Sequence, residues 1–239
     1  MQADDAFRST GLYLADDYLS REECAALLGP IKSYRGEHAD VRVSRDGGRR
    51  PLKYSVIDGI QVKQHLPELT ELYRQVNELV NSISNLALVP LENEKVGCNV
   101  NIMGSGNTYR WHYDRNAVTA ILYLNEVEGG ETECYPNYRI SLGNARFSKF
   151  QWMLDGVLQP DPVRKIFGRY KVVVPKAGRL LVMRGDRCLH SVKPVTGEEE
   201  RINIIMSYDL PGVNYAVDEK LDGYLYSREN SSRSDPNYR

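Results

Sequence analysis

A histidine and an aspartate two residues apart, His112 and Asp114, place the tightest constraint on how this chain of 239 residues can fold. Successive side chains of a β-strand alternate between the two faces of a sheet, so a strand presents both groups on one face. They can then bind one metal ion together. His190 lies far downstream and can complete the ligand set only from another strand. We therefore expect two strands that are distant in sequence to lie close together.

Two imidazoles and one carboxylate on one face of an ion form the ligand set of non-haem Fe(II) oxygenases, which leaves three coordination positions open. Arg201 follows His190 by eleven residues, where an adjacent strand can direct its guanidinium into the same cavity. A guanidinium can hold the distal carboxylate of a dicarboxylic co-substrate through two hydrogen bonds. The spacing thus predicts a metal site with an anion site beside it.

Strand-like sequence runs from about Lys95 to Asp209. Apolar runs bounded by Gly, Pro or charged residues indicate buried strands at Ile121–Leu124, Arg179–Met183 and Ile202–Met206. In the last of these strands one face carries Arg201, Asn203, Ile205 and Ser207. Arg201 can therefore face a cavity while the alternate side chains pack outward against a helix layer.

The N-terminal part reads as helical. Ser20 with Glu23 three residues later forms a capping-box pattern, which predicts a helix to about Gly29 or beyond. Pro67 starts a second helix, whose apolar residues follow helical spacing to Ile83. The polar stretch from Arg35 to Lys53 is expected to be a hairpin tip or a mobile loop at the rim of the cavity. The helices are the natural cover for the outer face of the sheet.

Several motifs together resemble the iron- and 2-oxoglutarate-dependent dioxygenases, in particular their prolyl-hydroxylase-like branch. The resemblance covers roughly residues 95 to 209 and rests on Trp111-His112-Tyr113-Asp114, Ile121-Leu-Tyr-Leu-Asn125, Gly129-Gly-Glu-Thr132, Pro175-Lys-Ala-Gly178, His190 and Arg201. It implies a mainly β (α+β) fold with a double-stranded β-helix, or jelly-roll, core and N-terminal helices on one outer face. It also implies a requirement for Fe(II), 2-oxoglutarate and O2.

The resemblance assigns roles residue by residue. His112, Asp114 and His190 would be the iron ligands and hence the catalytic residues, and Arg201 and Tyr123 would hold the far carboxylate of 2-oxoglutarate. The single domain would comprise a helical support over about 1–94, the jelly-roll core over about 95–209 with an insert at 137–171, and a C-terminal tail at 210–239.

Some positions refine this interpretation. Halogenating members of the family have a small residue where this chain has Asp114, which favours hydroxylation or a related oxidation. The branch that acts on nucleic acids usually has an arginine where Ser207 stands, which disfavours nucleic acid. Oxygen-sensing prolyl hydroxylases often carry a tyrosine at the position of Ile102, so Asn99, Asn101 or Ser207 would complete the co-substrate pocket.

The insert at 137–171 contains seven basic and two acidic residues, hence a charge of +5 in a chain of net charge −1. One interpretation is a substrate lid, which would recognise either an anionic group or the surface of a carrier protein. The other is a solvated surface insertion or an oligomer contact. Four residues are candidate substrate contacts: Arg110, Tyr113, Trp152 and Arg187.

The composition limits the partners. A net charge of −1 gives no argument for a polyanionic partner, and no apolar segment suggests a signal peptide or a membrane span. The four cysteines show no C-x-x-C pair, so reduced thiols and a cytoplasmic location are expected. The expected partner is a small molecule, which would be anionic if the insert is a substrate lid. The sequence leaves the oligomeric state open.

Three functions follow from these observations. The first is an oxygenase that hydroxylates or otherwise oxidises an unactivated C–H bond of a small metabolite or amino acid, in a biosynthetic pathway, with release of succinate and CO2. The second is a prolyl hydroxylase of peptides or proteins. The third is a non-catalytic jelly-roll binding protein, which would bind neither Fe(II) nor 2-oxoglutarate.

Overall fold

The computed structural model describes residues 3–45, 52–141 and 149–213. Within these ranges the helices are α1 (Ala3–Thr10), α2 (Arg21–Glu37), α3 (Gly59–His65), α4 (Pro67–Ser84), α5 (Glu94–Gly97), α6 (Lys149–Leu158) and α7 (Asp161–Phe167). The strands are β1 (Leu12–Ala15), β2 (Val41–Arg45), β3 (Leu52–Ile57), β4 (Val89–Pro90), β5 (Cys98–Met103), β6 (Tyr109–His112), β7 (Val118–Tyr123), β8 (Thr132–Tyr135), β9 (Lys171–Val173), β10 (Leu180–Met183), β11 (Leu189–Val192) and β12 (Arg201–Asp209).

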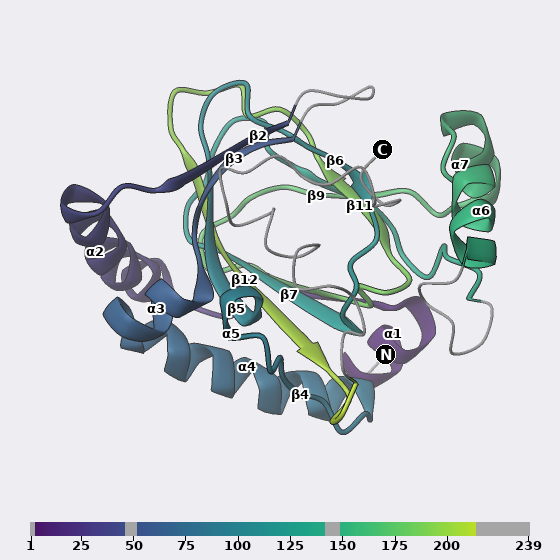
Figure 1. The fold of residues 1–239 in the computed structure, drawn as a ribbon, viewed down its shortest axis with the longest axis horizontal. Helices are drawn as coiled ribbons and strands as arrows, with labels where there is room; N and C mark the ends of the chain where they lie inside the picture. The colour runs from purple at the N-terminus through teal and green to yellow at the C-terminus, as the bar shows by residue number, and fades with distance from the viewer. Residues whose placement is uncertain (1–2, 46–51, 142–148, 214–239) are drawn as a thin grey trace.

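The strands form two sheets that face each other. The larger has the order β1-β10-β7-β12-β5-β3-β2, with β4 beside β12, and the smaller has the order β6-β11-β8-β9. The pairings in both are antiparallel. Figure 1 shows them as opposite walls of a flattened barrel. This architecture is a double-stranded β-helix, so the predicted fold class is confirmed.

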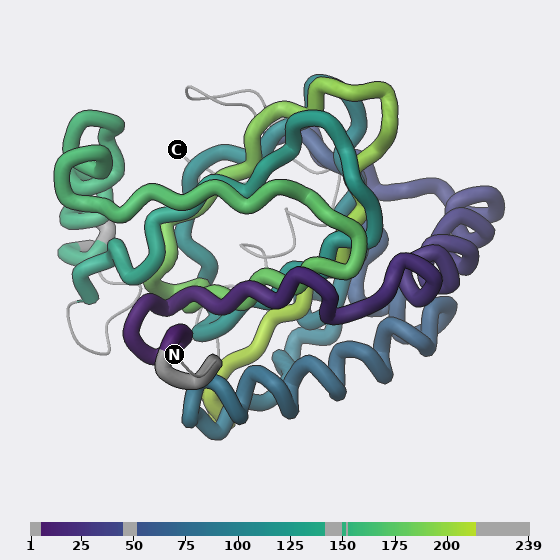
Figure 2. The backbone as a smooth tube through the Cα atoms, turned by 180° about the vertical axis from the view of Figure 1, so that it is seen from behind, coloured from purple at the N-terminus to yellow at the C-terminus, as the bar shows by residue number. Residues whose placement is uncertain are grey.

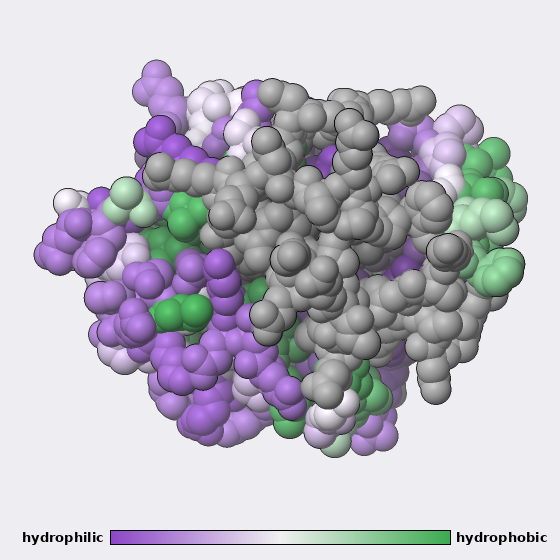
Figure 3. Space-filling view, viewed as in Figure 1, coloured by the Kyte–Doolittle hydropathy of each residue, from purple (hydrophilic) through white to green (hydrophobic). Residues whose placement is uncertain are grey.

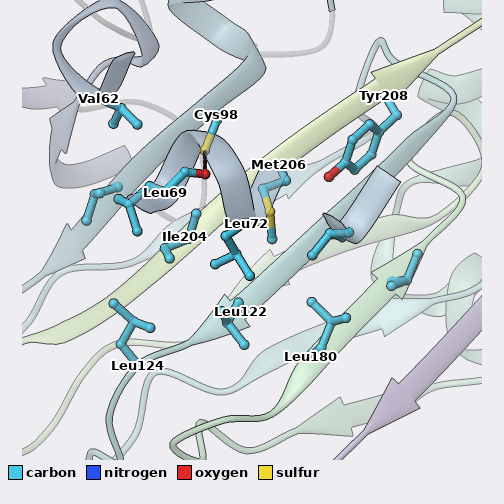
Figure 4. Packing of buried hydrophobic residues seen from close by; sticks show 14 of the residues in the cluster. Val62, Leu69, Leu72, Cys98, Leu122, Leu124, Leu180, Ile204, Met206 and Tyr208 are labelled. Carbon is cyan, nitrogen blue, oxygen red and sulfur yellow. Dashed lines mark hydrogen bonds between the residues drawn. The ribbon is translucent and has the colours of Figure 1, made fainter. Parts of the chain in front are cut away.

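The helices cover the outer face of the larger sheet, as the sequence predicts. Leu69, Val76 and Val80 of α4 are almost fully buried and belong to one cluster with Ile204 and Leu122 of the sheet. Figure 4 shows this interface at the level of side chains. Burying each such side chain stabilises the fold by about 1.5–3 kcal/mol relative to exposing it. Viewed from behind, α2 and α4 lie at the same edge of the barrel (Figure 2).

Local signals set where these elements begin. The Ser20 side chain accepts from the Glu23 amide at 3.1 Å, and the Glu23 carboxylate accepts from the Ser20 amide at 2.7 Å. This confirms the capping box, and the helix continues to Glu37. The stretch expected to form a hairpin tip does form a hairpin, since Val41 pairs with Val56, but its tip at 46–51 lies outside the described residues.

The insert at 137–171 contains α6 and α7, which lie at one end of the barrel (Figure 1). Figure 3 shows apolar surface over these helices. Exposed side chains there are Phe150, Met153, Val157, Ile166 and Phe167. Residues 142–148 and the tail from 214 onward, on which part of the sequence-based interpretation falls, lie outside the described residues.

Two of the basic residues of the insert are used within the protein. Arg139 forms a buried ion pair with Asp155, and Arg164 pairs with Asp161 while its guanidinium lies 4.0 Å from the centre of the Trp111 ring. The charge of the insert is therefore partly neutralised by its own structure. Lys165, Arg169 and Lys171 are exposed.

The cysteines agree with the expectation of reduced thiols. All four cysteines are buried free thiols, as the spacing predicts. Across the described ranges, the helices are too short or too polar to cross a membrane.

Candidate metal centre

The smaller sheet brings the three predicted metal ligands together. His112 ends β6 and pairs directly with His190 of β11, while Asp114 follows two residues after His112. Oδ1 of Asp114 lies 3.4 Å from Nε2 of His112 and 3.6 Å from Nε2 of His190. One ligand atom from each residue lies within 4.8 Å of the others, close enough for all three to bind one ion.

Backbone carbonyls fix the orientation of both imidazoles. Nδ1 of His112 lies 2.9 Å from the carbonyl oxygen of Arg110, and Nδ1 of His190 lies 3.1 Å from that of Cys188. A carbonyl only accepts, so each Nδ1 carries the proton and each Nε2 turns its lone pair toward the metal position. The folded chain thus holds both rings in the tautomer that a metal ligand requires.

The electrostatics of the apoprotein suit a cation. Burial, followed by the neighbouring His112, lowers the pKa of His190 to about 4, so this imidazole is neutral at pH 7. Burial opposes the ionisation of Asp114, but His190, His112 and the Thr119 hydroxyl together lower its pKa to about 2. At pH 7 the centre therefore offers a neutral nitrogen from His190 and an anionic oxygen from Asp114 to a metal ion.

A β-bulge decides which neighbours share the face of the ligands. Between β6 and β11, His112 pairs with His190 but Tyr109 pairs with Val192, so β6 has one residue more than its partner. Tyr109 consequently lines the cavity, with its ring centre 4.5 Å from that of His112. Arg110, which simple alternation places on the ligand face, does not line it. The expectation that Arg110 contacts substrate therefore gains no support from this cavity and stays a prediction.

Two other candidate substrate contacts, Tyr113 and Arg187, lie away from this cavity. Tyr113 is fully buried in an aromatic cluster on the opposite face from its neighbours, with the guanidinium of Arg139 4.9 Å from its ring centre. Arg187 is exposed and lies in a turn, where its backbone amide donates to the Arg184 carbonyl. Neither lines the cavity. The side chain of Trp152 lies outside what the structure describes.

One cavity of about 110 Å³ joins the metal centre to the inner face of the larger sheet. It is lined by Leu91, Asn93, Val96, Asn101, Tyr109, His112, Asp114, Arg115, Asn116, Thr119, Ile121, His190, Val192, Arg201, Asn203, Ile205 and Ser207. The alternate residues of β12 contribute from Arg201 at one end to Ser207 at the other, as the strand pattern predicts. The described residues of the insert at 137–171 do not contribute to this lining.

Arg201 lies at one end of the cavity and is only 1% exposed. Its guanidinium donates to the side-chain oxygen of Asn203 and, at 3.2 Å, to the hydroxyl of Thr132. The Tyr123 hydroxyl lies 2.7 Å from the same Thr132 oxygen, and the guanidinium stands 5.1 Å from the centre of the Tyr123 ring. Thus the two residues assigned to the co-substrate carboxylate lie together. A Cβ on Gly130 would come within 2.9 Å of Cδ of Arg201, so this close approach requires glycine.

The polar atoms around Arg201 are incompletely satisfied. Nε of Arg201 and Nδ2 of Asn203 are buried without a hydrogen-bond partner, and in the described part of the chain the guanidinium contacts Met103, Asn203 and Thr132 but no carboxylate. A buried cation without a counter-ion costs free energy. This end of the cavity therefore suits an anion that the protein itself does not provide, such as the carboxylate of a bound molecule.

Sequence reasoning missed several residues at the site. Arg115 and Asn116 line the cavity from the turn after Asp114, and Thr119 lines it from β7. The only available signal for Thr119 was its alternation with Ile121 on one strand face. Of the proposed pocket residues, Asn101 and Ser207 line the cavity, whereas Asn99 donates to the Val96 carbonyl at 3.4 Å.

Comparison with known proteins places the chain among proteins of this fold. Residues 98–208 match the sequence profile of the 2OG-Fe(II) oxygenase superfamily. The carbocyclase SnoK from nogalamycin biosynthesis is similar in structure, with a TM-score of 0.69 at 17% identity over 94% of this chain and 88% of that chain. A Pseudomonas putida prolyl-4-hydroxylase gives a TM-score of 0.56 at 20% identity, over 88% and 98% of the two chains.

A third similar structure is the epimerase SnoN from nogalamycin biosynthesis, with a TM-score of 0.67 at 16% identity over 87% of this chain and 82% of that chain. At these identities the likeness shows a shared fold. The chain matches none of the curated proteins with which it was compared.

Proposed function

Because residues 98–208 match the profile of the 2OG-Fe(II) oxygenase superfamily, we propose that this protein is an Fe(II)- and 2-oxoglutarate-dependent oxygenase that oxidises a C–H bond of a small molecule. The single observation that carries the proposal is one cavity that joins His112, Asp114 and His190 to the buried guanidinium of Arg201, which has no carboxylate partner among the described residues. The triad suits the Fe(II) ion and Arg201 suits the carboxylate of 2-oxoglutarate, and such an enzyme must bind both.

Each residue then has a task. Nε2 of His112 and His190 and Oδ1 of Asp114 would hold the metal, while Arg201 would bind the distal carboxylate of 2-oxoglutarate. When bound, Fe(II) and 2-oxoglutarate supply the oxidising chemistry, in which R–H, O2 and 2-oxoglutarate give R–OH, succinate and CO2. The buried apolar walls, including Ile121, exclude water from this chemistry.

The charges on the cavity wall favour an anionic substrate. Two lining residues are cationic, Arg115 and Arg201, and Asp114 is the one lining carboxylate in the described ranges. The lining thus carries more cationic than anionic side chains, which suits a substrate with a carboxylate. We therefore propose that an anionic group of the substrate lies near Arg115, in the turn after the metal ligand.

Peptide prolyl hydroxylation is the second candidate. The similar structures include a Trichoplax adhaerens prolyl hydroxylase in complex with a peptide fragment, at a TM-score of 0.61 and 17% identity over 87% of each chain. The first candidate is preferred because the cavity is small and its wall carries Arg115 beside the metal centre.

Anaerobic titration of the purified apoprotein with Fe(II) and then with 2-oxoglutarate tests the proposal. A visible metal-to-ligand charge-transfer band is expected in the wild type, and Asp114→Ala is the matched control that should lack it. A folded, iron-supplied wild type without the band would exclude the oxygenase function and favour a binding protein. Succinate release should then be higher with amino and hydroxy acids than with their amides, whereas selective release with proline-containing peptides would support the second candidate.

A further inference from the structure

A hydrogen-bonded chain of three side chains supports the carboxylate of the metal centre from behind. The Thr119 hydroxyl donates to Oδ2 of Asp114 at 2.5 Å, and Nδ2 of Asn116 donates to the Thr119 oxygen at 2.9 Å. Asn116 and Thr119 are 6% and 3% exposed. Two of the three residues are outside the set of expected metal ligands, so their arrangement requires a separate explanation.

The direction of these hydrogen bonds is fixed by their chemistry. Nδ2 of Asn116 also lies 2.6 Å from the carbonyl oxygen of Val118, which can only accept, so the amide group must point its nitrogen there. Thr119 receives one amide proton and has one hydroxyl proton of its own to donate. A carboxylate that serves as a metal ligand only accepts. The hydroxyl proton therefore points at Oδ2 of Asp114.

This arrangement separates the two oxygens of Asp114. Oδ1 faces Nε2 of both histidines at 3.4 and 3.6 Å, whereas Oδ2 is occupied by Thr119. A carboxylate that used both oxygens would fill four of six positions together with two imidazoles. A carboxylate that uses one oxygen leaves three positions, which a chelating co-substrate and O2 together require.

The backbone of Gly185 lies close to both Asp114 and Thr119. The Asp114 amide donates to the Gly185 carbonyl at 3.0 Å. A Cβ on Gly185 would lie 2.8 Å from Oγ1 of Thr119 and 2.9 Å from Cβ of Asp114. The bare glycine backbone thus packs directly against both the hydroxyl and the carboxylate-bearing side chain, which restricts the movement of each.

We propose that Thr119 is a positioning residue that, supported by Asn116, holds Asp114 as a one-oxygen metal ligand and so keeps three coordination positions open. This inference rests on the proposed function, because it assumes that the triad binds a metal ion. It makes Thr119 a determinant of metal affinity and coordination number without direct contact with the metal.

Replacing Thr119 by Val removes the hydroxyl and keeps the shape, while Thr119→Ser keeps the hydroxyl and is the matched control. Titration with Co(II) or Fe(II) should show about 10–100-fold weaker binding in Thr119→Val, the range found when such supporting partners of metal ligands are lost. Thr119→Ser should stay close to wild type. The visible spectrum of the Co(II)-loaded protein, whose intensity reports coordination number, should change in Thr119→Val alone.

The outcomes separate the two proposals. If the wild type binds neither Fe(II) nor 2-oxoglutarate, the proposed function fails. If the wild type binds both, and Thr119→Val has wild-type metal affinity and spectrum with only a lower melting temperature, Thr119 is a structural residue and the inference is wrong. Should Thr119→Val fail to fold, Asn116→Ala provides the second test. It leaves the hydroxyl proton free to rotate away, so metal binding should weaken by a few fold, and unchanged binding would contradict the proposal.

Discussion

Replacing Arg201 by Met tests two effects of the buried guanidinium separately: its effect on the stability of the apoprotein and its effect on the affinity for 2-oxoglutarate. The side chain is 1% exposed, and its guanidinium has partners in Thr132 and Asn203 but no carboxylate among the described residues. Met fills a similar volume without charge. The apoprotein should lose the hydrogen bonds and also the desolvation penalty of the cation, which amounts to several kcal/mol. We therefore expect the stability of the apoprotein to change by less than about 2 kcal/mol.

The effect on the co-substrate should be much larger. Two charge-assisted hydrogen bonds to a carboxylate contribute about 1.5–3 kcal/mol each. Their loss corresponds to roughly 100- to 10,000-fold weaker binding of 2-oxoglutarate, since each 1.4 kcal/mol is a factor of about ten. The iron affinity should be unaffected, because the ligands His112, Asp114 and His190 are unchanged.

Thermal unfolding with added Mn(II), with and without 2-oxoglutarate, measures both quantities. The co-substrate should stabilise the wild type by about 2.7 kcal/mol when its concentration is 100 times its dissociation constant, and should leave Arg201→Met unshifted at that concentration. Equal stabilisation of both proteins would refute the role of Arg201. A loss of more than about 4 kcal/mol in the apo variant would refute the argument that the unpaired cation is costly.

Three further predictions concern the rest of the molecule. Asp155→Ala removes the carboxylate of the buried ion pair with Arg139 and should cost about 3–5 kcal/mol in urea unfolding, with the double variant Arg139→Met/Asp155→Leu losing less. A loss below about 1 kcal/mol for Asp155→Ala would contradict the importance of this ion pair. The pKa of His190 is about 4 when folded against 6.5 in the unfolded chain, so the unfolded state takes up the proton first, and the apoprotein should lose stability as the pH falls from 6.5 to 4. The proton NMR signal of His190, assigned by its loss in His190→Gln, should keep the chemical shift of a neutral imidazole down to about pH 5. A titration midpoint near pH 6.5 would refute the lowered pKa of His190. Gly178→Ala puts a Cβ 1.8 Å from the Leu19 carbonyl oxygen at a φ of +79° and should lower the melting temperature by many degrees, whereas a shift under 2 °C would show that the turn adapts.

The sequence alone predicted the features that depend on local periodicity. The two-residue spacing of His112 and Asp114 predicted that both face one cavity, and strand alternation put Arg201 on the cavity side of β12. All three residues line the cavity, although β6 ends at His112 and Asp114 lies just beyond it. The capping box at Ser20 and the apolar face of the helix that begins at Pro67 were likewise readable, because each involves residues within a few positions of one another.

Tertiary structure alone decided the features that depend on register and on partners distant in sequence. The bulge between β6 and β11 puts Tyr109 in the cavity in place of Arg110, because the extra residue in one strand shifts the alternation. Asp155 neutralises Arg139, so a cation that looked available for substrate is used for packing. Thr119 of β7 contacts Asp114 only because the fold brings β7 next to the turn that carries Asp114. Periodicity specifies the face on which a side chain lies, but the group that it meets there is set by the packing of the whole chain.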